Sequence, residues 1–472
     1  MDPNVFFLTI TELNAKLKAK EFSCVELTTA FCDRLEKLGP RFNALALPLR
    51  EDALRQARKV DDDLKRQRYR GPLQGIPFGA KDLLAYAGHP TTWGARPYAG
   101  QVFDRNASVI NRLLKTGAVL TGKLSMVELA GGGGYRYAAA SLTGPGLNPW
   151  DAARWSGGSS SGSGSAVAAG LVTFALGSET SGSIITPSAF CGVTGLRPTY
   201  GLVSRAGAMA LSWTMDKIGP MCRSAEDCGL VLQVISGKDN DDPASAGKSY
   251  YYFPQYARKM TDLRVGYAPA DFEEWADESC RPALRDALKA LREIGLQWKE
   301  VELPDLPYGA ATSTIISAEG SAAFEELIES GKVDELADSK QIAGLKAGIE
   351  IPAREYFRAM KVRTLVQAAF RRLFVDVDLL LTPSRRNVAS NVKDPLDGSS
   401  RAAEAKSGRG LRDLIPAGNL AGLPALSLPC GFANGLPVGI TLVTRPFNEN
   451  TMLAVGREFQ IRTDWHRRRP RL

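Results

Sequence analysis

The first part of the chain places apolar residues at helical spacing among charged ones. These apolar positions are Leu13, Leu17, Val25, Leu27, Phe31, Leu35 and Leu38. The spacing predicts amphipathic helices from Thr9 onward. Thr9 or Thr11 is the candidate N-cap of the first helix, and Gly39-Pro40 is typical of the end of the second. We therefore expect a helical lead-in over residues 1–70.

From residue 71 the pattern changes to short apolar runs separated by Gly, Ser and Pro. The runs lie at residues 75–78, 118–120 and 171–176. Runs of this kind are typical of strands that are buried on both faces, and residues 109–115 have helical spacing between them. The pattern predicts a mixed or parallel α/β sheet.

The second half of the chain is more helical. After a polar stretch at residues 237–247, helical spacing returns at 282–294 and 353–374, and a strand-like run follows at 377–381. Residues 425–443 predict two strands joined by a turn at 431–435, and a last helix begins near Asn450.

The numbers of histidines and cysteines limit which catalytic groups and metal sites the protein can have. The 472 residues include only two histidines, His89 and His466. A Ser-His-Asp or Cys-His hydrolase needs an imidazole base, and most zinc sites need imidazole ligands. The seven cysteines have no Cys-x-x-Cys spacing, which argues against a zinc cluster or a disulfide framework. We expect no metal, no cofactor and a base other than histidine.

Charge and hydropathy bear on partners and location. The formal charge is +8, and part of the excess lies in an arginine-rich C-terminal tail, which is more often solvated than bound to nucleic acid. The N-terminus lacks the basic residues of a secretory signal, and the longest apolar run, 166–177, is too short to cross a bilayer. We expect a cytoplasmic monomer or homodimer that binds neither nucleic acid nor membrane.

Two loops rich in serine and glycine flank the apolar run at 171–176. The first, residues 156–165, contains a Gly-x-Ser-x-Gly pattern around Ser160, but only His466 follows it as a possible partner. A flexible linker is the alternative. The second loop, residues 177–185, is either a turn or a set of backbone N–H groups that bind an oxyanion. A third segment, 117–123, resembles a phosphate-binding loop but has Leu124 where a hydroxyl is needed.

Lys81 is the candidate base. It follows the apolar residues 75–80, which would carry it into the interior if they form a strand. Burial favours the neutral amine, and lowering a lysine pKa from about 10.4 to about 7 corresponds to roughly 4–5 kcal/mol. Most lysines are solvated, but a neutral Lys81 could replace the missing histidine.

Together these segments resemble one family, the amidase signature hydrolases. The resemblance runs through residues 75–82, 155–166, 175–184 and 190–201, with further landmarks at 216–220, 419–425, 435–439 and 463–468. It implies a single domain over residues 1–472 with a large mixed β-sheet covered by helices on both faces. Within it, residues 71–225 would carry the catalytic motifs, 240–410 would shape the substrate site, and 411–472 would return to the core.

The resemblance also implies a Ser-Ser-Lys triad and an oxyanion hole. Ser183 matches the nucleophile, Ser159 matches the bridging serine that the family holds on a cis peptide, and Lys81 matches the base. The residues that match the oxyanion hole are Thr180, Ser181, Gly182 and Ser183.

The chain departs from the family pattern in the second loop. Glu179, Ser181 and Ile185 stand where aspartate, glycine and arginine are usual. Two oppositely charged positions change together, so we expect any ion pair across this loop to be lost and the loop or pocket to be altered.

A further departure concerns the substrate. Amidotransferase subunits of the family, which release ammonia from glutamine, have a Ser-Ser-Thr-Glu-Asn stretch where this chain has residues 132–138. The residues Met126, Tyr135, Tyr137 and Trp213 indicate instead an apolar or aromatic pocket, although core packing is the commoner role of each.

The sequence therefore predicts a stand-alone amidase that acts on small-molecule amides. The expected substrates are neutral hydrophobic or aromatic amides, with esters or carbamates as further candidates, and the acyl group would be held on Ser183. One alternative is the glutaminase (A-type) subunit of an amidotransferase complex. The other is a catalytically silent binding protein, because the second loop is altered.

Overall fold

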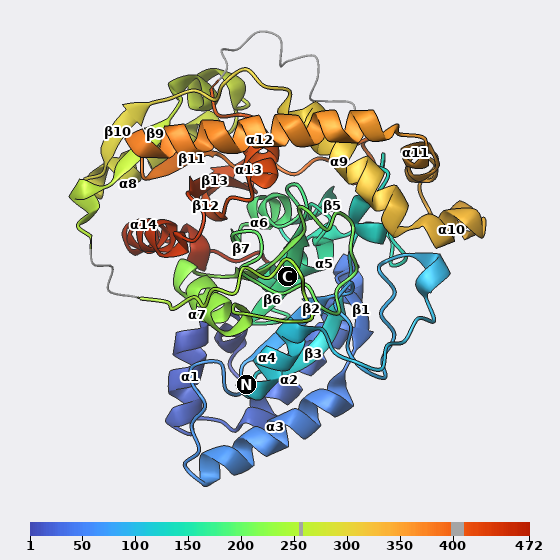
Figure 1. Ribbon diagram of the computed structural model, residues 1–472. Coiled ribbons are helices and arrows are strands. Elements are labelled where there is room, and N and C mark those ends of the chain that lie inside the picture. Colours follow the sequence, from blue (N-terminus) through green and yellow to red (C-terminus); the bar gives the residue numbers. More distant parts are fainter. Residues whose placement is uncertain (254–257, 398–409) are drawn as a thin grey trace.

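One mixed β-sheet runs through the centre of the molecule, with helices on both sides (Figure 1). The computed structural model describes residues 1–253, 258–397 and 410–472. In these ranges the sheet has 11 strands in the order β1-β3-β2-β6-β8-β7-β12-β13-β11-β9-β10. The strands are β1 (Leu45–Pro48), β2 (Pro77–Lys81), β3 (Val119–Leu124), β6 (Phe174–Glu179), β7 (Thr194–Arg197), β8 (Lys217–Cys222), β9 (Arg264–Tyr267), β10 (Gln297–Glu300), β11 (Leu379–Pro383), β12 (Ala425–Ala433) and β13 (Leu436–Thr444).

Pairing within this sheet is parallel in some places and antiparallel in others. Strand β2 runs parallel to both β3 and β6, and β9 runs parallel to β10 and β11. Strand β6 is antiparallel to β8. A separate ribbon joins β4 (Leu147–Asn148) to β5 (Asp151–Trp155). The mixed sheet predicted from the family resemblance is confirmed.

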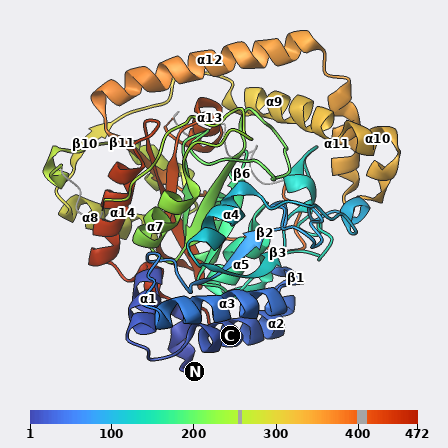
Figure 2. The same ribbon diagram turned by 60° about the horizontal axis from the view of Figure 1, so that its bottom comes forward.

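Three helices form most of the predicted lead-in. They are α1 (Ile10–Lys18), α2 (Cys24–Leu38) and α3 (Arg50–Lys65), and they lie together at the end of the molecule opposite α12 (Figure 2). Thr9 caps α1: its hydroxyl accepts a hydrogen bond from the Glu12 N–H, and the Glu12 carboxylate accepts one from the Thr9 N–H. The expectation that this region is entirely helical was wrong for residues 45–48. These residues form β1, which pairs with β3 at one edge of the sheet.

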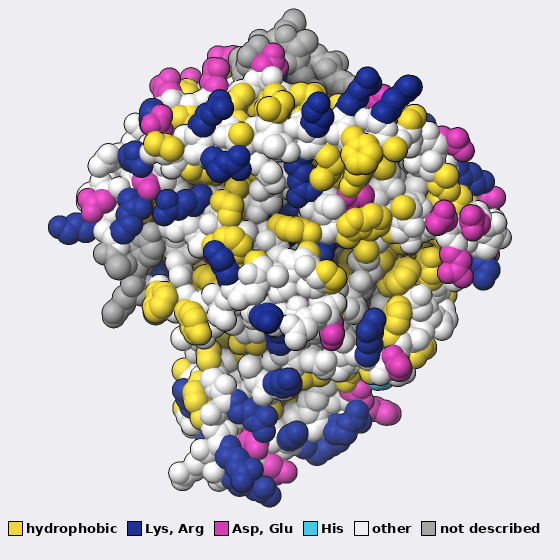
Figure 3. Space-filling model, in the orientation of Figure 1, with side chains coloured by type: hydrophobic (Ala, Val, Ile, Leu, Met, Phe, Trp, Pro, Cys, Tyr) yellow, Lys and Arg dark blue, Asp and Glu magenta, His cyan; other side chains and the backbone are white. Residues whose placement is uncertain are grey.

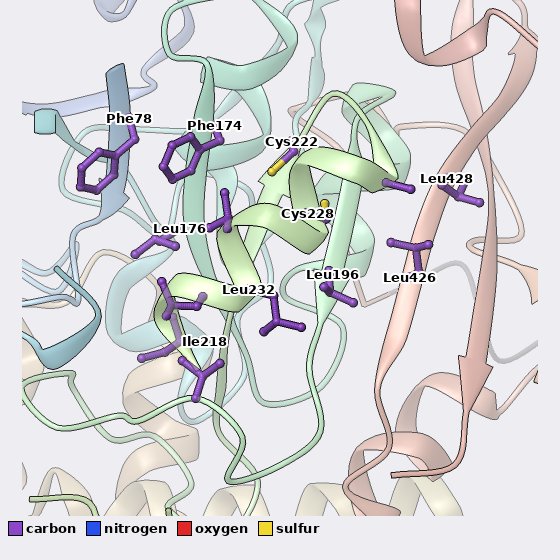
Figure 4. Packing of buried hydrophobic residues seen from close by; sticks show 14 of the residues in the cluster. Phe78, Phe174, Leu176, Leu196, Ile218, Cys222, Cys228, Leu232, Leu426 and Leu428 are labelled. Carbon is purple, nitrogen blue, oxygen red and sulfur yellow. The ribbon is translucent and has the colours of Figure 1, made fainter. Parts of the chain in front are cut away.

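Apolar side chains of the central strands point alternately to the two faces of the sheet. Phe174 stacks on Phe78 with ring centroids 5.2 Å apart, on the face covered by α7 (Ala225–Ile235) (Figure 4). Ala175 lies in a separate buried cluster with residues of α5 (Ser161–Ala168). Burial on both faces explains why these strands are apolar runs without alternation.

Strand β6 begins at Phe174, three positions later than the apolar run predicted. The Leu171 N–H donates to the Ala166 carbonyl at 2.8 Å and so closes the C-terminal turn of α5. The first residues of the run therefore belong to the connection between the helix and the strand.

The remaining helices are distributed over both faces and one end. They are α4 (Ser108–Lys115), α6 (Ile185–Cys191), α8 (Arg281–Glu293), α9 (Tyr308–Ala323), α10 (Glu325–Glu329), α11 (Ser339–Ile349), α12 (Ala353–Asp376), α13 (Leu414–Ala421) and α14 (Glu449–Arg462). Short 3₁₀ helices lie at Pro3–Phe7, Pro40–Phe42, Arg96–Tyr98, Glu128–Gly131, Met260–Asp262, Lys332–Glu335 and Trp465–Arg467, and a π-helical turn lies at Asp271–Trp275. Helices α9, α12 and α13 share one apolar cluster with α6, which begins beside the second loop. Residues 254–257 and 398–409 of the predicted substrate-shaping region lie outside the described residues.

The C-terminal hairpin has a shorter turn than the sequence indicated. Ala433 pairs with Leu436, so only Asn434 and Gly435 form the turn, both at positive φ (52° and 77°). An Asn-Gly pair with this geometry matches the twist of the two strands. Gly431 lies within β12, where the register shifts.

The described helices and the face of the molecule in Figure 3 bear on the expectations for membrane and nucleic acid. No helix in the described ranges combines the length and apolar content that crossing a membrane requires. Lys and Arg side chains are spread over the face shown in Figure 3, with Asp and Glu among them. All seven cysteines are buried and unpaired.

Candidate active site

Lys81 ends strand β2 inside the protein. All five residues of β2 are buried, and the Lys81 amine lies between two serines. Its Nζ donates to Ser159 Oγ at 2.7 Å and to Ser178 Oγ at 2.9 Å. Burial lowers the pKa of Lys81 to about 7, although the nearby carboxylates of Asp216 and Glu179 oppose the shift. The predicted burial of Lys81 is confirmed.

Ser159 lies in the first serine-glycine loop, immediately before α5. The Gly158–Ser159 peptide bond is cis. Gly157 has φ 87°, and a methyl group on it would come within 2.7 Å of Pro187 Cα. A methyl group on Gly158 would similarly meet Val127 and Trp155 at less than 3 Å. The loop is a tightly packed wall and not a linker, because only glycine fits at these positions.

Ser183 lies in the second loop, just before α6, and lines a cavity of about 580 Å³. The Ser160 N–H donates to the Ser183 carbonyl at 3.3 Å, which ties the two loops together. In the described part of the chain, no hydrogen bond joins the hydroxyls of Ser159 and Ser183. The structure therefore brings Lys81 to Ser159 and places Ser183 at the adjoining cavity.

The predicted oxyanion-hole residues form the loop between β6 and α6. The backbone N–H groups of Ser181, Gly182 and Ser183 donate no hydrogen bond to any described residue. Gly182 has φ 86°, which favours glycine. Thr180 is held by its side chain, whose hydroxyl donates to Asp216 at 2.6 Å. The loop thus offers consecutive free donors beside the Ser183 hydroxyl.

Glu179 forms an ion pair outside the second loop, while none crosses the loop among the described residues, as the exchange to Ile185 predicts. Its carboxylate lies 2.7 Å from Arg197 Nη1 and accepts hydrogen bonds from the Asn419 amide at 2.9 Å and from the Ile184 and Ile185 N–H groups. Burial alone would raise the pKa of Glu179, but Arg197 and these donors lower it to about 2. Glu179 therefore pairs with Arg197 on β7 and not with a residue on the other side of the loop.

Ile185 also has a structural role. Its side chain is fully buried in the apolar cluster that α6 shares with α9, α12 and α13. An arginine at this position would place a charge among apolar side chains. The exchange to isoleucine therefore fits the apolar surroundings of the loop, while Glu179 keeps the loop's hydrogen bonds.

The predicted pocket residues lie at different places in the structure. Tyr135 lines the cavity together with Ser183, and its ring contacts Trp155 edge to face at 6.3 Å. Met126 is fully buried in the main core and does not line this cavity, which corrects its prediction. Trp213 lines a smaller neighbouring cavity, and Tyr137 is exposed at the surface. Apolar character alone did not distinguish a core residue from a pocket residue.

Two residues near the site were missed by the sequence analysis. Ser178, the second partner of Lys81, lies one residue before Glu179 in β6. Arg385 follows β11 and lines the same cavity as Ser183. The available signal for Arg385 was a pair of arginines shortly after a buried strand, within the region where the sequence showed no motif.

The alternative motifs do not form sites. His89 Nε2 contacts Asp52 at 2.9 Å, His466 is buried elsewhere, and neither histidine lines the cavity. Ser160 hydrogen bonds to the backbone of Ser178 through its hydroxyl. The segment that resembled a phosphate loop forms β3, whose Lys123 is buried against Asp82 at 2.7 Å. Across the residues that the structure describes, no cluster of His, Cys, Asp or Glu could hold a metal ion.

Comparison with known proteins identifies the family. The sequence model described as Amidase matches residues 26–453. The A-type subunit of glutamyl-tRNA(Gln) amidotransferase from Chloroflexus aggregans is 39% identical, and the match covers 99% of this chain and 98% of that relative. The solved peptide amidase from Stenotrophomonas maltophilia has a TM-score of 0.82 at 29% identity and covers 96% of both chains. The solved A-type subunit of glutamyl-tRNA(Gln) amidotransferase from Thermotoga maritima has a TM-score of 0.80 at 27% identity and covers 100% of this chain and 98% of that chain.

These similarities extend along almost the whole chain and not only along the serine-glycine loops. All strands of the sheet, the site and most of the helices lie within the matched residues 26–453. The chain belongs to the amidase family, as its resemblance to the amidase signature hydrolases implies.

Proposed function

We propose that the protein hydrolyses a carboxylic amide C–N bond and that Ser183 carries the acyl group. The observation that supports this most directly is the 2.7 Å contact between Lys81 Nζ and Ser159 Oγ, next to the cavity that Ser183 lines. An amine with a pKa of about 7 is largely neutral above that pH and can accept a proton. Lys81 thereby supplies a base to a site without histidine.

The proposed reaction begins with two proton transfers. Lys81 Nζ takes the proton of Ser159 while Ser159 Oγ takes the proton of Ser183. Ser183 Oγ then forms a bond to the amide carbonyl carbon, and the carbonyl oxygen receives the electron pair. The amide C–N bond breaks next, the carbonyl re-forms, and the leaving amine receives from Lys81, through Ser159, the proton that Ser183 gave up. Water cleaves the Ser183 ester by the same relay and releases the acid.

The loop between β6 and α6 supplies the electrostatic part of this mechanism. The free N–H groups of Ser181, Gly182 and Ser183 would bind the oxyanion that forms on the carbonyl oxygen. Removing one such donor costs about 3–4 kcal/mol of transition-state stabilisation in other hydrolases. The contacts of Glu179 with the Ile184 and Ile185 N–H groups fix the end of this loop before the reaction begins.

Two candidate functions differ in the amide substrate and in whether the protein works with partner subunits. The aromatic wall formed by Tyr135, Trp155 and Phe190 supports a stand-alone amidase for hydrophobic or aromatic amides, and for related esters or carbamates. The sequence relatives favour the other candidate: a relative at 39% identity is named as a component of glutamyl-tRNA(Gln) amidotransferase, which supports a glutaminase subunit that works with protein partners. Both candidates use the same hydrolytic step.

The third interpretation, a catalytically silent binding protein, is no longer supported by the observation that motivated it. It depended on an altered second loop, and Glu179 compensates that alteration through Arg197 and Asn419. The loop N–H groups remain unengaged by described residues, and Lys81 remains in contact with Ser159.

A substrate panel with the purified full chain tests the proposal. The panel contains short aliphatic amides, anilides, carbamates and L-glutamine, with Ser183→Ala as the control. Hydrolysis by the parent and none by Ser183→Ala supports the reaction. No turnover on any substrate, with no reaction of the parent with a serine-directed reagent, would reject it. Preference for L-glutamine together with co-purification of a second subunit from the native source would identify the glutaminase candidate.

A further inference from the structure

Arg385 places a positive charge in the wall of the catalytic cavity. It lies just after β11, and both it and Ser183 line the cavity of about 580 Å³. Its Nη2 donates to the Thr186 hydroxyl, three residues after Ser183 on the first turn of α6. A methyl group on Gly182 would come within 2.7 Å of Arg385 Nη2. The guanidinium therefore lies against the loop that carries the proposed nucleophile.

This charge has no counter-ion among the described residues. No carboxylate in those ranges lies within salt-bridge distance of Arg385, and its buried Nε has no hydrogen-bond partner there. Glu179, whose charge acts on Arg385, is already paired with Arg197 and accepts three further hydrogen bonds. Burial lowers the pKa of Arg385, which is the effect expected of a cation that lacks a close acid.

A partly buried guanidinium without a carboxylate is unfavourable unless another group compensates it. Arg386, the next residue, also lines the cavity, but its Nε donates to the Trp275 carbonyl at 3.0 Å, whereas the Nε of Arg385 is buried without a partner among the described residues. Thr186 supplies Arg385 with a neutral acceptor only. The remaining donors of Arg385 are left for a ligand in the cavity, and a guanidinium binds a planar anion with two parallel hydrogen bonds.

We propose that Arg385 is a specificity-determining residue that binds a carboxylate group of the substrate, so that the preferred substrate is an amide with a free carboxylate elsewhere in the molecule. The reacting amide itself is neutral, and the second group carries the charge. This inference rests on the proposed amide hydrolysis and replaces the expectation of an uncharged substrate.

The substrate class is compatible with both candidates for the protein's role. The monoamides of dicarboxylic acids belong to it, and so does L-glutamine. The aromatic side chains of Tyr135 and Trp155 in the same cavity would contact the carbon chain between the amide and the carboxylate.

Matched substrate pairs test the proposal. Each pair contains a dicarboxylic monoamide and the uncharged amide in which a methyl group replaces the carboxylate, such as succinamate and butyramide, over a series from malonamate to adipamate. Ammonia release gives kcat and KM for the parent, Arg385→Met, Arg385→Lys and the neighbouring control Arg386→Met. We expect the parent to prefer the charged member of at least one pair. In Arg385→Met the kcat/KM for that member should fall about 10- to 100-fold, mainly through KM.

The uncharged members and the control variants make the result specific. Arg385→Met should leave kcat/KM for the uncharged amides unchanged, Arg385→Lys should keep part of the preference, and Arg386→Met should keep all of it. An equal loss on both members of each pair would mean that Arg385 only supports the loop. A parent that hydrolyses uncharged amides without any preference for a carboxylate would overturn the inference and leave the proposed function standing.

A binding measurement distinguishes a failure of the carboxylate subsite from a failure of the proposed amide hydrolysis. If the parent hydrolyses no amide, the proposed function fails, and calorimetric titration with succinate still tests the site. Binding of succinate to Ser183→Ala that is lost in Ser183→Ala/Arg385→Met would support the carboxylate subsite. Equal binding to both proteins, or binding to neither, would contradict it.

Discussion

Lys81 Nζ lies 2.7 Å from Ser159 Oγ, although the two residues are 78 positions apart in the sequence. The contact forms because β2 brings Lys81 to the end of a buried strand while the first serine-glycine loop packs over that end. A primary amine in such surroundings is more easily held neutral than in water. The geometry therefore has a direct consequence for how activity depends on pH.

Activity should rise with pH through the neutral range. Because burial lowers the pKa of Lys81 from 10.5 to about 7, kcat/KM should increase about tenfold per pH unit below pH 7 and level off above it. The measurement is kcat/KM on one uncharged amide between pH 5 and 9, with Lys81→Met as the inactive control. A rate that does not change across this range would contradict the role of Lys81 as the base.

Ser178 should act as a positioning residue for that base. Its hydroxyl accepts a hydrogen bond from Lys81 Nζ at 2.9 Å, which favours the charged amine. In Ser178→Ala we expect kcat/KM to fall about 3- to 10-fold, the value of one neutral hydrogen bond. The midpoint of the pH profile should also move to lower pH.

A matched serine supplies the control for this variant. Ser163 is buried on α5, and its hydroxyl donates to the Leu176 carbonyl at 3.0 Å and not to Lys81. Ser163→Ala should leave the midpoint of the pH profile in place, whatever it does to stability. If Ser178→Ala leaves both the rate and the midpoint unchanged, Ser178 does not position Lys81.

Glu179→Gln should destabilise the fold. The exchange leaves Arg197 buried without its carboxylate, and removing one member of a buried pair typically costs about 3–5 kcal/mol. Urea unfolding measures the change, and Glu179→Gln/Arg197→Met should recover part of it, since the unpaired charge is then gone. A change below about 1 kcal/mol in the single variant would show that the pair contributes little.

The same carboxylate should contribute to acid sensitivity. Its pKa is lowered on folding from 4.5 to about 2, so its contribution to stability is complete above about pH 4.5 and is lost as the pH falls towards 2. Between these pH values the unfolded chain binds a proton that the folded chain does not. Glu179→Gln should unfold with a weaker dependence on pH in this window than the parent, as measured by urea titrations at pH 3, 4 and 5.

Much of the site could be predicted because its signals are local. The apolar residues before Lys81 and the glycines around Ser159 and Ser183 are contiguous in the sequence, and short buried strands and tight loops leave such patterns. The capping box at Thr9 is equally local. The roles of the three triad residues came from the family resemblance, which the motifs carried.

The features of the site that the sequence did not predict depend on contacts between distant segments of the chain. Glu179 and Asn419 are 240 positions apart, and Thr186 and Arg385 are 199 apart, so no local pattern joins them. The ion pair of Glu179 could not be predicted from its loop, because its partner Arg197 lies on another strand. Met126 illustrates the same limit, because a methionine in a core and one in a pocket look alike in sequence.

The identity of the nucleophile is the central claim, and one labelling experiment tests it most directly. The purified parent is treated with a fluorophosphonate reagent, digested and mapped by mass spectrometry, with Ser183→Ala treated in parallel. We predict a single adduct on Ser183 that blocks hydrolysis and is missing in the variant. An adduct on Ser160 or Ser181, or full hydrolytic activity in Ser183→Ala, would contradict the account.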